Sequence, residues 1–444
     1  MYSKEIAEYF KKNGIKTGDA LKIEYDGVNV EGTLMPTTEA GSPDAIVIKL
    51  KNGYNIGVKF ENTRITKLDD EERKPASFPK ASLKQDGKLP NVSLIYTGGT
   101  IGSKVDYKTG GVHILLKPEE LFYEVPELSE IAKISATNPF TIWSEDLSYP
   151  EWQKLAKEIA GALNSGARGV VVTLGTDTMH YASAALSFML QDLNAPVVLV
   201  GAQRSSDRGS SDAFINLICA AQVAAKSDIA EVGICMHRSS SDNECHFIRG
   251  TKARKMHSSR RDAFRPINDT AIAYVTQDGK ITYASQYKKM AHTKTKVTAK
   301  TDFEEKVALV KVYPNSNPEI IDYYVGKGYK GIIIEGTGLG HAPLSPTTKS
   351  HSWLEHIKNA IAKGVIVGMT SQTLYGRVNA NVYSTARKLE DIGVIYCEDM
   401  LPETAYIKLG WLLGNYDAKK AREMLPKNIA GEINQRTDYD AFLV

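Results

Sequence analysis

A chain of 444 residues with 42% hydrophobic and 24% charged residues has an ordinary globular composition and is long enough for two or three domains. Its 55 Lys and Arg residues and 52 Asp and Glu residues give a formal net charge of +3. So small a charge gives no bulk argument for a nucleic-acid-binding or membrane-surface protein, although local charged patches remain open.

The opening segment, MYSKEIAEYFKKNG, alternates charged and apolar residues and lacks the uninterrupted apolar core of a signal peptide. Elsewhere no apolar run approaches membrane-spanning length, so we expect a cytoplasmic protein without membrane contact. Four cysteines stand apart without a CxxC pair, which favours reduced, buried thiols over a disulfide framework: Cys219, Cys235, Cys245 and Cys397.

The first 75 residues carry the signals of short strands. The stretches GDALKIEYDGVNVEGTLMP and DAIVIKLKNGYNIGVKF alternate apolar and polar residues around Asp-Gly and Asn-Gly turns. We expect residues 1–75 to form a small all-β barrel, an accessory module without catalytic residues. A charged stretch with Pro75, Pro79 and Pro90 follows, which indicates a linker over residues 76–90.

From residue 91 onward, apolar runs such as VSLIY, GVVVTL, APVVLV and GIIIEG recur with helical patterns between them. Continuous Val, Ile and Leu runs separated by helices are typical of strands buried on both faces of a mainly parallel sheet. The polar, basic stretch KKMAHTKTKVTAK interrupts this pattern. We therefore expect a larger α/β domain over residues 91–295 and a smaller one over residues 296–444.

One helix is defined with particular clarity. Ser148 and Glu151 have the spacing of a capping box, and Pro150 suits the first turn. The residues that follow place an apolar stripe on one face: Trp152, Leu155, Ala156, Ile159, Ala160 and Leu163.

Two glycine-rich turns raise the possibility of nucleotide binding. The turn at Gly98 lacks the GK[ST] ending of a P-loop. The segment EGTGLGHAP has His341 where a dinucleotide-binding fingerprint needs its last glycine, and no clear helix follows. Both nucleotide-binding interpretations are weak.

A metal site is a further alternative, because CMHRSSSDNECH brings Cys235, His237, Cys245 and His246 within a dozen residues. Zinc sites prefer two to four residues between paired cysteines, which this spacing does not match. A packed strand end followed by a loop is favoured over zinc.

Two strands end in turns that carry hydroxyl groups. LIYTGGTIGSK places Gly98, Gly99 and Thr100 after one strand, and VVVTLGTDTMHYASAALSFML places Thr176 and Asp177 after another. Because α/β proteins collect their ligands at the carboxyl ends of parallel strands, both turns fall at a candidate site. Thr and Asp are also preferred helix N-caps, so a purely structural role remains open.

The segment RGTKARKMHSSRRDAF could supply a base. An alcohol attacks an amide only when a base removes its proton, and a lysine can serve. A solvated basic loop is the alternative. Residue patterns alone cannot establish that this loop meets the two hydroxyl turns.

The trio YTGGTIG, LGTDTM and RGTKARK closely resembles the bacterial-type L-asparaginase and glutaminase family from residue 91 onward. The resemblance implies an asparaginase-like two-domain α/β fold in which a threonine attacks a side-chain carboxamide, ammonia leaves and water hydrolyses the acyl-enzyme. It also implies catalytic roles for Thr100, Thr176, Asp177 and Lys255, with Lys252 as the fallback for the lysine. Which threonine attacks first stays open.

The same resemblance suggests further site residues. Tyr107 corresponds to a mobile-loop tyrosine, although it lies closer to Thr100 than in the free asparaginases. Backbone N–H groups of the glycine turns, at Gly99 and Gly175, would stabilise the oxyanion. Ser144 and Glu145 would bind the amino-acid head group of the substrate, with an ordinary helix-leading loop as the alternative.

The β module ahead of the TGGT strand resembles the D-subunit family of the archaeal glutamyl-tRNA(Gln) amidotransferases. This resemblance implies a glutaminase without metal or cofactor of its own, paired with itself and with an E subunit in a two-plus-two heterotetramer. The E subunit would bind tRNA(Gln), use ATP and magnesium, and accept the ammonia. A free cytosolic L-asparaginase and a non-catalytic scaffold are the alternatives.

Overall fold

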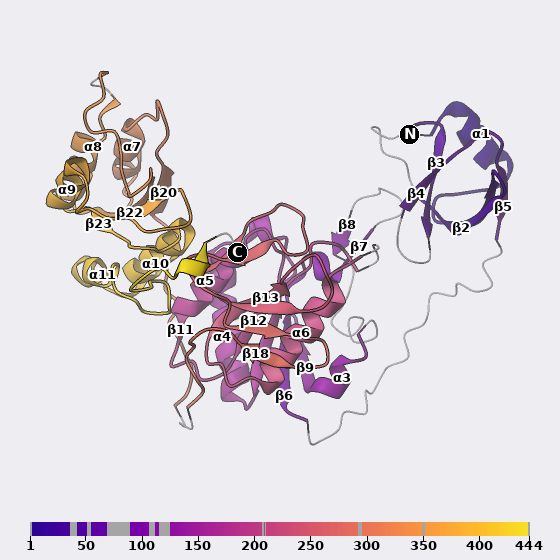
Figure 1. Ribbon diagram of the computed structural model, residues 1–444, viewed down its shortest axis with the longest axis horizontal. Helices are drawn as coiled ribbons and strands as arrows, with labels where there is room; N and C mark the ends of the chain where they lie inside the picture. Colours follow the sequence, from indigo (N-terminus) through magenta and orange to yellow (C-terminus); the bar gives the residue numbers. More distant parts are fainter. Residues whose placement is uncertain are drawn as a thin grey trace.

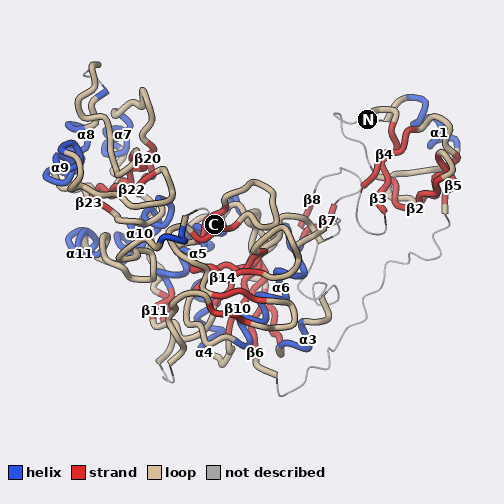
Figure 2. The backbone as a smooth tube through the Cα atoms, viewed as in Figure 1, coloured by secondary structure: helices blue, strands red, loops and turns tan. Residues whose placement is uncertain are grey.

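The computed structural model describes residues 2–35, 42–50, 55–68, 89–105, 112–114, 125–206, 208, 210–291, 295–348 and 351–442. Within these residues the chain forms an N-terminal β module, a large α/β domain and a small α/β domain (Figure 1). Figure 2 shows the strands of both α/β domains with helices packed around them. No helix of the described residues is both long and apolar enough to cross a membrane.

The N-terminal module is a five-stranded antiparallel sheet in the order β4-β3-β2-β1-β5, preceded by a helix. The antiparallel strands expected here are confirmed, whereas the module is not purely β, because Ile6 and Phe10 of the helix pack into its core. Most of the expected linker, residues 76–90, lies outside the described residues. The elements are α1 (Lys4–Lys12), β1 (Ala20–Tyr25), β2 (Val28–Leu34), β3 (Ala45–Leu50), β4 (Asn55–Lys59) and β5 (Arg64–Lys67).

The large domain is built on an eight-stranded sheet in the order β18-β17-β14-β13-β12-β10-β6-β9. The five strands from β13 to β9 are parallel, and the other three are antiparallel, so the sheet is mainly parallel as expected. The strands are β6 (Asn91–Tyr96), β9 (Lys133–Thr137), β10 (Gly169–Thr173), β12 (Val197–Val200), β13 (Val232–His237), β14 (Cys245–Arg249), β17 (Ala273–Val275) and β18 (Ile281–Tyr283).

Helices cover both faces of this sheet, which explains its continuous apolar strands. Val170 and Val172 of β10 pack with α4 and α5, whereas Val171 packs with α3 and α6 on the opposite face. The capping box of α4 is present, with the Ser148 N–H donating to Glu151 Oε2 at 3.0 Å. The helices are α3 (Leu128–Ile131), α4 (Tyr149–Asn164), α5 (Met179–Met189) and α6 (Ala213–Lys226).

Short elements complete the large domain. Near the expected boundary at residues 295 and 296 the chain still belongs to this domain, because β19 pairs with β11. The elements are η2 (Thr100–Gly102), β7 (Ser103–Val105), β8 (Val112–Ile114), η3 (Ser144–Asp146), β11 (Leu190–Gln191), β15 (Ala253–Lys255), β16 (Phe264–Pro266) and β19 (Thr298–Ala299).

The small domain has a four-stranded parallel sheet in the order β20-β21-β22-β23. Its helix α10 joins the core of the large domain, where Trp411 stacks on Phe188 of α5 with ring centroids 5.8 Å apart. The elements are β20 (Val307–Lys311), α7 (Glu319–Gly326), β21 (Gly331–Gly336), α8 (Leu354–Ala362), β22 (Ile366–Ser371), α9 (Ser384–Asp391), β23 (Ile395–Tyr396), α10 (Pro402–Asn415), α11 (Ala418–Met424) and η5 (Tyr439–Ala441).

The Cys and His residues of the disfavoured zinc motif lie on the paired strands β13 and β14, where His237 opposes Cys245. His237 Nδ1 lies 2.6 Å from Asn216 Oδ1, and all four cysteines are free and buried. No group of three or more His, Cys, Asp or Glu residues in the described part of the chain is arranged to hold a metal. These residues form a packed strand pair.

His246, on β14, is expected to make the fold sensitive to acid. Burial, followed by the charges of Arg265 and Arg238, lowers its pKa from 6.5 to about 3. Between these values the unfolded chain binds a proton that the folded chain excludes, so stability falls as the pH decreases, by at most about 1.4 kcal/mol per pH unit. Denaturant unfolding from pH 7 to pH 4 should show a shallower pH dependence for His246→Gln than for the wild type. Parallel curves would contradict this prediction.

Candidate functional site

Two turns at the carboxyl edge of the large sheet form the centre of the site. Strands β6 and β10 are parallel neighbours, with Tyr96 opposite Thr173, so the chain leaves both strands at the same level. The Thr97 hydroxyl donates to the Thr173 carbonyl at 2.6 Å and joins the two turns at their origin. The expectation that both hydroxyl turns share one edge is therefore confirmed.

Glycines allow the two turns to touch. A Cβ atom on Gly99, whose φ is +79°, would lie 2.5 Å from the backbone nitrogen of Gly175. A Cβ atom on Gly175 would in turn lie 2.8 Å from the Ser144 Cβ. Because no side chain fits at either glycine, both are needed for the close approach of three separate segments.

Lys255 reaches the second turn from a different part of the chain. It lies on β15, which pairs with β16 in a short antiparallel hairpin. Its Nζ donates to Thr176 Oγ1 at 2.9 Å and to Asp177 Oδ1 at 2.6 Å. The Lys255 side chain is 9% exposed and that of Asp177 is 66% exposed, so the carboxylate closes the solvent side of the contact. A hydroxyl, an amine and a carboxylate therefore converge.

Thr100 belongs to the same site through the backbone. It begins η2 directly after Gly99, the residue that touches Gly175, and its side chain is half-buried. The Ser103 hydroxyl donates to the Gly99 carbonyl at 2.7 Å, which fixes the turn after the first strand. The two threonines thus lie on adjacent turns, as the sequence predicts.

Ser144, which is expected to bind substrate, is hydrogen-bonded to the turn that carries Thr176. Its Oγ accepts from the Asp177 N–H at 3.3 Å, and its carbonyl accepts from the Thr178 hydroxyl at 2.5 Å. Glu145 follows on η3 and is exposed to solvent. Glu145, whose carboxylate is expected to bind the substrate ammonium, therefore directly follows Ser144, the residue that contacts the Thr176 turn.

The fallback lysine is directed elsewhere. Lys252 has a fully buried side chain, and its Nζ lies 2.7 Å from Asp399 Oδ2 in the small domain. Lys255, not Lys252, contacts Thr176. Tyr107, the expected loop tyrosine, lies outside the described residues.

A pocket of about 510 Å³ adjoins the Lys255 and Asp177 pair, and the sequence interpretation missed part of its lining. Arg254 pairs with Glu403 of α10, and His180 lies 4.0 Å from the same carboxylate. Burial, followed by the charges of Arg254 and Lys255, lowers the pKa of His180 to about 3, which keeps its imidazole neutral. His180 lies only four residues after Thr176, in the first turn of α5, a signal that could have identified it, whereas Glu403 has no local signal.

The second glycine-rich turn, after β21, makes no comparable site. The Gly340 N–H donates to the Thr337 carbonyl at 3.0 Å, and a bridge pairs Thr337 with His341, so the segment closes on itself. Helix α8 begins only at Leu354. A nucleotide-binding turn would open directly into a helix, and this segment does not.

Family comparisons cover almost the whole chain. Residues 91–289 match the asparaginase N-terminal domain, residues 306–425 match the glutaminase/asparaginase C-terminal domain, and residues 15–68 match the GatD N-terminal domain.

Solved structures of L-asparaginases share the fold of the two α/β domains. The thermostable L-asparaginase from Thermococcus kodakarensis is 28% identical with a TM-score of 0.68, covering 78% of this chain and 100% of its own. L-asparaginase I from Vibrio cholerae is 28% identical with a TM-score of 0.67, covering 78% of this chain and 99% of its own.

Full-length relatives include the β module as well. The D subunit of the glutamyl-tRNA(Gln) amidotransferase of Pyrococcus furiosus is 51% identical over 446 residues, covering 99% of this chain and 100% of its own. The corresponding protein of Methanothermobacter thermautotrophicus is 45% identical over 442 residues, with 99% of both chains covered. The chain therefore belongs to the D-subunit family of the glutamyl-tRNA(Gln) amidotransferases.

Proposed function

We propose that this chain is the glutaminase subunit of an amidotransferase that converts Glu-tRNA(Gln) to Gln-tRNA(Gln). It hydrolyses glutamine to glutamate and supplies the released ammonia to a partner subunit. The observation that carries the proposal is the contact of Lys255 Nζ with both Thr176 Oγ1 and Asp177 Oδ1, in a chain of this family.

The chemistry follows from these groups. One threonine hydroxyl attacks the carboxamide carbon of glutamine and its proton passes to a base. The base returns this proton to the amide nitrogen, and the C–N bond breaks to release ammonia and leave the acyl-enzyme. Water then hydrolyses the acyl-enzyme to glutamate and restores the hydroxyl. Lys255 is placed to accept the proton of the Thr176 hydroxyl, and Asp177 orients the lysine side chain. N–H groups of the Gly99 and Gly175 turns stabilise the oxyanion, an effect worth roughly 3 kcal/mol per donor.

Substrate recognition is assigned to the segment beside the second turn. Glu145 pairs with the ammonium of the amino-acid head group, and Ser144, held by the Asp177 N–H, contacts the same end. A catalytic role for Tyr107 rests on the family resemblance alone. The difference between glutamine and asparagine is one methylene, worth only about 1–3 kcal/mol, so the preference for glutamine rests on the family.

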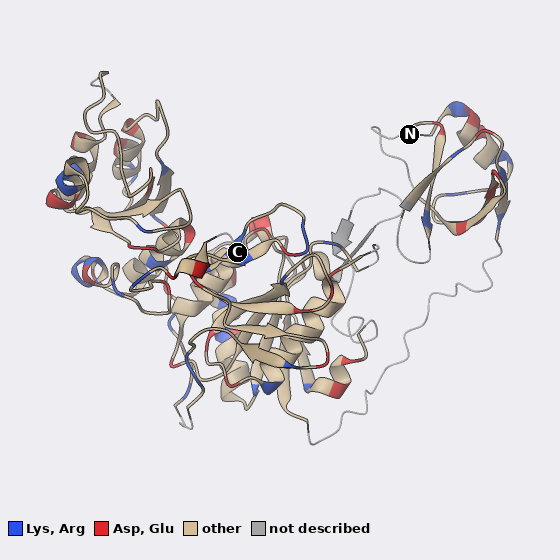
Figure 3. Cartoon of the chain, in the orientation of Figure 1, with Lys and Arg blue, Asp and Glu red and all other residues tan. Residues whose placement is uncertain are grey.

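The assembly is part of the proposal. The chain pairs with itself and with an E subunit in a two-plus-two heterotetramer in the cytoplasm. The E subunit uses ATP and magnesium and binds most of the tRNA, and this chain needs no metal or cofactor for the threonine chemistry. Lys and Arg residues are interspersed with Asp and Glu residues along the described elements (Figure 3), which suits a subunit that leaves the RNA contact to its partner.

Removing either hydroxyl should abolish ammonia release. Thr100→Val and Thr176→Val each replace the hydroxyl by a methyl group of similar volume, so the fold should remain. We expect turnover of glutamine, measured with the partner present, to fall at least about 100-fold. Thr370→Val, which removes a buried hydroxyl bonded to the Ile334 carbonyl in the small domain, is the matched control and should keep full turnover. Full activity in either site variant would refute the role of that threonine.

Lys255→Met should also be inactive, because it removes the only amine bonded to Thr176 among the described residues. General-base catalysis is worth roughly 10²- to 10⁴-fold, and kcat should fall within that range. Asp177→Asn keeps the shape and removes the charge, so it should lower kcat less. A Lys255→Met enzyme with normal kcat would overturn the assignment of the lysine.

The assembly can be tested with the purified chain. Ammonia release from glutamine should rise strongly when the E subunit and glutamylated tRNA are added, and the chain should co-purify with the E subunit. Fast turnover of asparagine by the chain alone would instead indicate a free L-asparaginase.

A further inference from the structure

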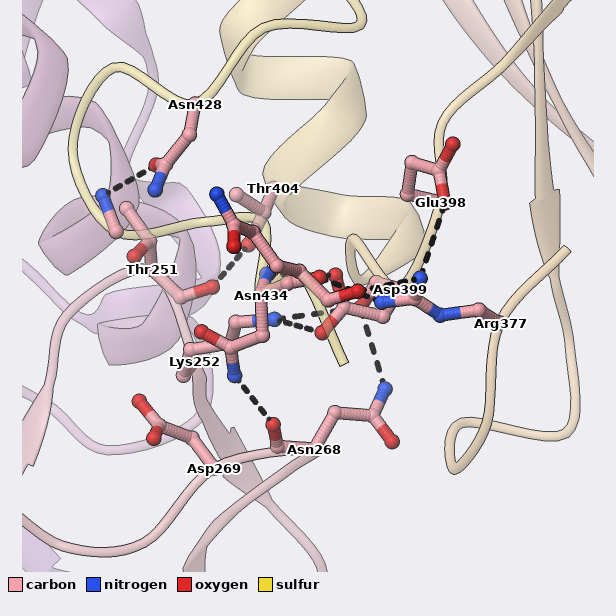
Figure 4. A network of polar contacts seen from close by, with 12 residues as sticks. Thr251, Lys252, Asn268, Asp269, Arg377, Glu398, Asp399, Thr404, Asn428 and Asn434 are labelled. Carbon is pink, nitrogen blue, oxygen red and sulfur yellow. Dashed lines mark hydrogen bonds and ion pairs between the residues drawn. The ribbon is translucent and has the colours of Figure 1, made fainter. Parts of the chain in front are cut away.

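A buried network of polar contacts joins the large domain to the small domain around Lys252 and Asp399 (Figure 4). It links the residues that flank the β15–β16 hairpin to the loop before α10, to α10 itself and to the segment after α11. Its central residues are Thr251, Lys252, Asn268, Asp399, Thr404 and Asn434.

Asp399 is the centre of this network. Its Oδ2 lies 2.7 Å from the Lys252 Nζ, and both side chains are fully buried. Its Oδ1 accepts from the Asn434 N–H at 3.0 Å, so both carboxylate oxygens have partners. A buried carboxylate with this many donors holds them in one geometry.

Asp399 also holds the other strand of the hairpin at its base. Asn268 follows β16, and its Nδ2 donates to the Asp399 carbonyl at 3.2 Å. The Asn268 Oδ1 accepts from the Gly376 N–H at 2.8 Å, so this side chain is fixed from the small domain on both sides. The Ile267 N–H donates to the Lys252 carbonyl at 2.9 Å and closes the base of the hairpin between these two anchors.

The paired strands of the hairpin are short. β15 and β16 pair over Ala253 to Lys255, three residues of each strand, and the Arg254–Glu403 ion pair adds a further link to the small domain. Lys255 is the last of them, at the end opposite the base. A small rotation at the base would therefore shift the Lys255 amine relative to Thr176.

We propose that Asp399 and Lys252 are positioning residues for Lys255: their buried ion pair fixes the base of the β15–β16 hairpin and thereby sets the distance between the Lys255 amine and the Thr176 hydroxyl. The inference rests on the proposed function, and it makes the small domain part of the catalytic apparatus. Neither residue contacts the reacting atoms.

The test compares two lysines that each form a fully buried ion pair. Lys408 Nζ lies 2.6 Å from Glu432 Oε1, and both side chains are fully buried, like those of Lys252 and Asp399. After Lys408→Met, Glu432 keeps the Ile429 and Ala430 N–H donors, just as Asp399 keeps the Asn434 N–H after Lys252→Met. Both variants therefore lose a buried ion pair, and Lys408→Met also loses the bonds to the Leu425 and Lys427 carbonyls, so it is the more severe structural change of the two. Of the two lysines, only Lys252 adjoins the hairpin.

Both variants should be less stable, but only Lys252→Met should change the chemistry. We expect its kcat for glutamine, measured in the complete complex and corrected for the folded fraction, to fall about 10- to 100-fold. Its KM should stay within about twofold, because the head-group residues Ser144 and Glu145 lie on another segment. Lys252→Arg, which keeps the charge, should restore most of kcat, and Lys408→Met should keep the wild-type kcat.

Equal kcat values for Lys252→Met and Lys408→Met would overturn the positioning role. Should Lys252→Met fail to fold, the double variant Lys252→Met with Asp399→Leu removes both charges together and is expected to fold with the same low kcat. A normal kcat in that double variant would equally overturn the proposal. A Lys255→Met enzyme that stays active would instead refute the proposed function, which separates the two failures.

Discussion

The site depends on one constraint, the contact between the backbones of two turns. Because β6 and β10 are parallel and paired in register, their turns leave the sheet together, and glycine at positions 99 and 175 lets them touch. A Cβ atom on Gly99 would lie 2.5 Å from the Gly175 nitrogen, and one on Gly175 would lie 2.8 Å from the Ser144 Cβ, so a side chain at either glycine would force these segments apart. This contact brings together the segments that carry Thr100, Thr176 and Ser144.

Much of the fold follows from local patterns in the sequence. The continuous valines of β10 face two helical layers, which is why the run GVVVTL has no polar alternation. The capping box at Ser148 and Glu151 fixes the start of α4 from four residues alone. Because parallel strands end at the same edge of a sheet, the sequence was sufficient to predict that Thr100 and Thr176 lie on neighbouring turns.

The remainder of the site depends on contacts between segments that are far apart in the chain. The local sequence does not distinguish Lys252 from Lys255 as the catalytic lysine. Only the family resemblance favours Lys255. What separates the two lysines is packing, because Lys252, the residue before β15, is buried against Asp399 of the small domain, which lies 147 residues away along the chain. Glu403, which binds Arg254, is equally remote. Neither acid carries a local sequence signal, because its role is created by domain packing.

Lys252 and Lys255 have different roles because their surroundings differ. Burial lowers the pKa of Lys252, and the Asp399 carboxylate opposes this effect, so the pair survives in the interior only as a unit. Such a pair adds little net stability compared with apolar side chains, but an ion pair with fixed hydrogen bonds accepts only one geometry. The Lys252–Asp399 ion pair therefore contributes more to the specific placement of the β15–β16 hairpin than to net stability.

The charges around Lys255 are balanced in the same manner. Arg254 is the adjacent residue, and its positive charge is offset by Glu403. His180, in the same pocket, is neutral because burial and the two cations lower its pKa to about 3. With the neighbouring cation paired and the imidazole uncharged, the exposed carboxylate of Asp177 is the charge that acts most directly on the Lys255 amine. The charge next to the Lys255 amine therefore lies at the solvent face of the site, where a bound substrate would change the hydration of Asp177.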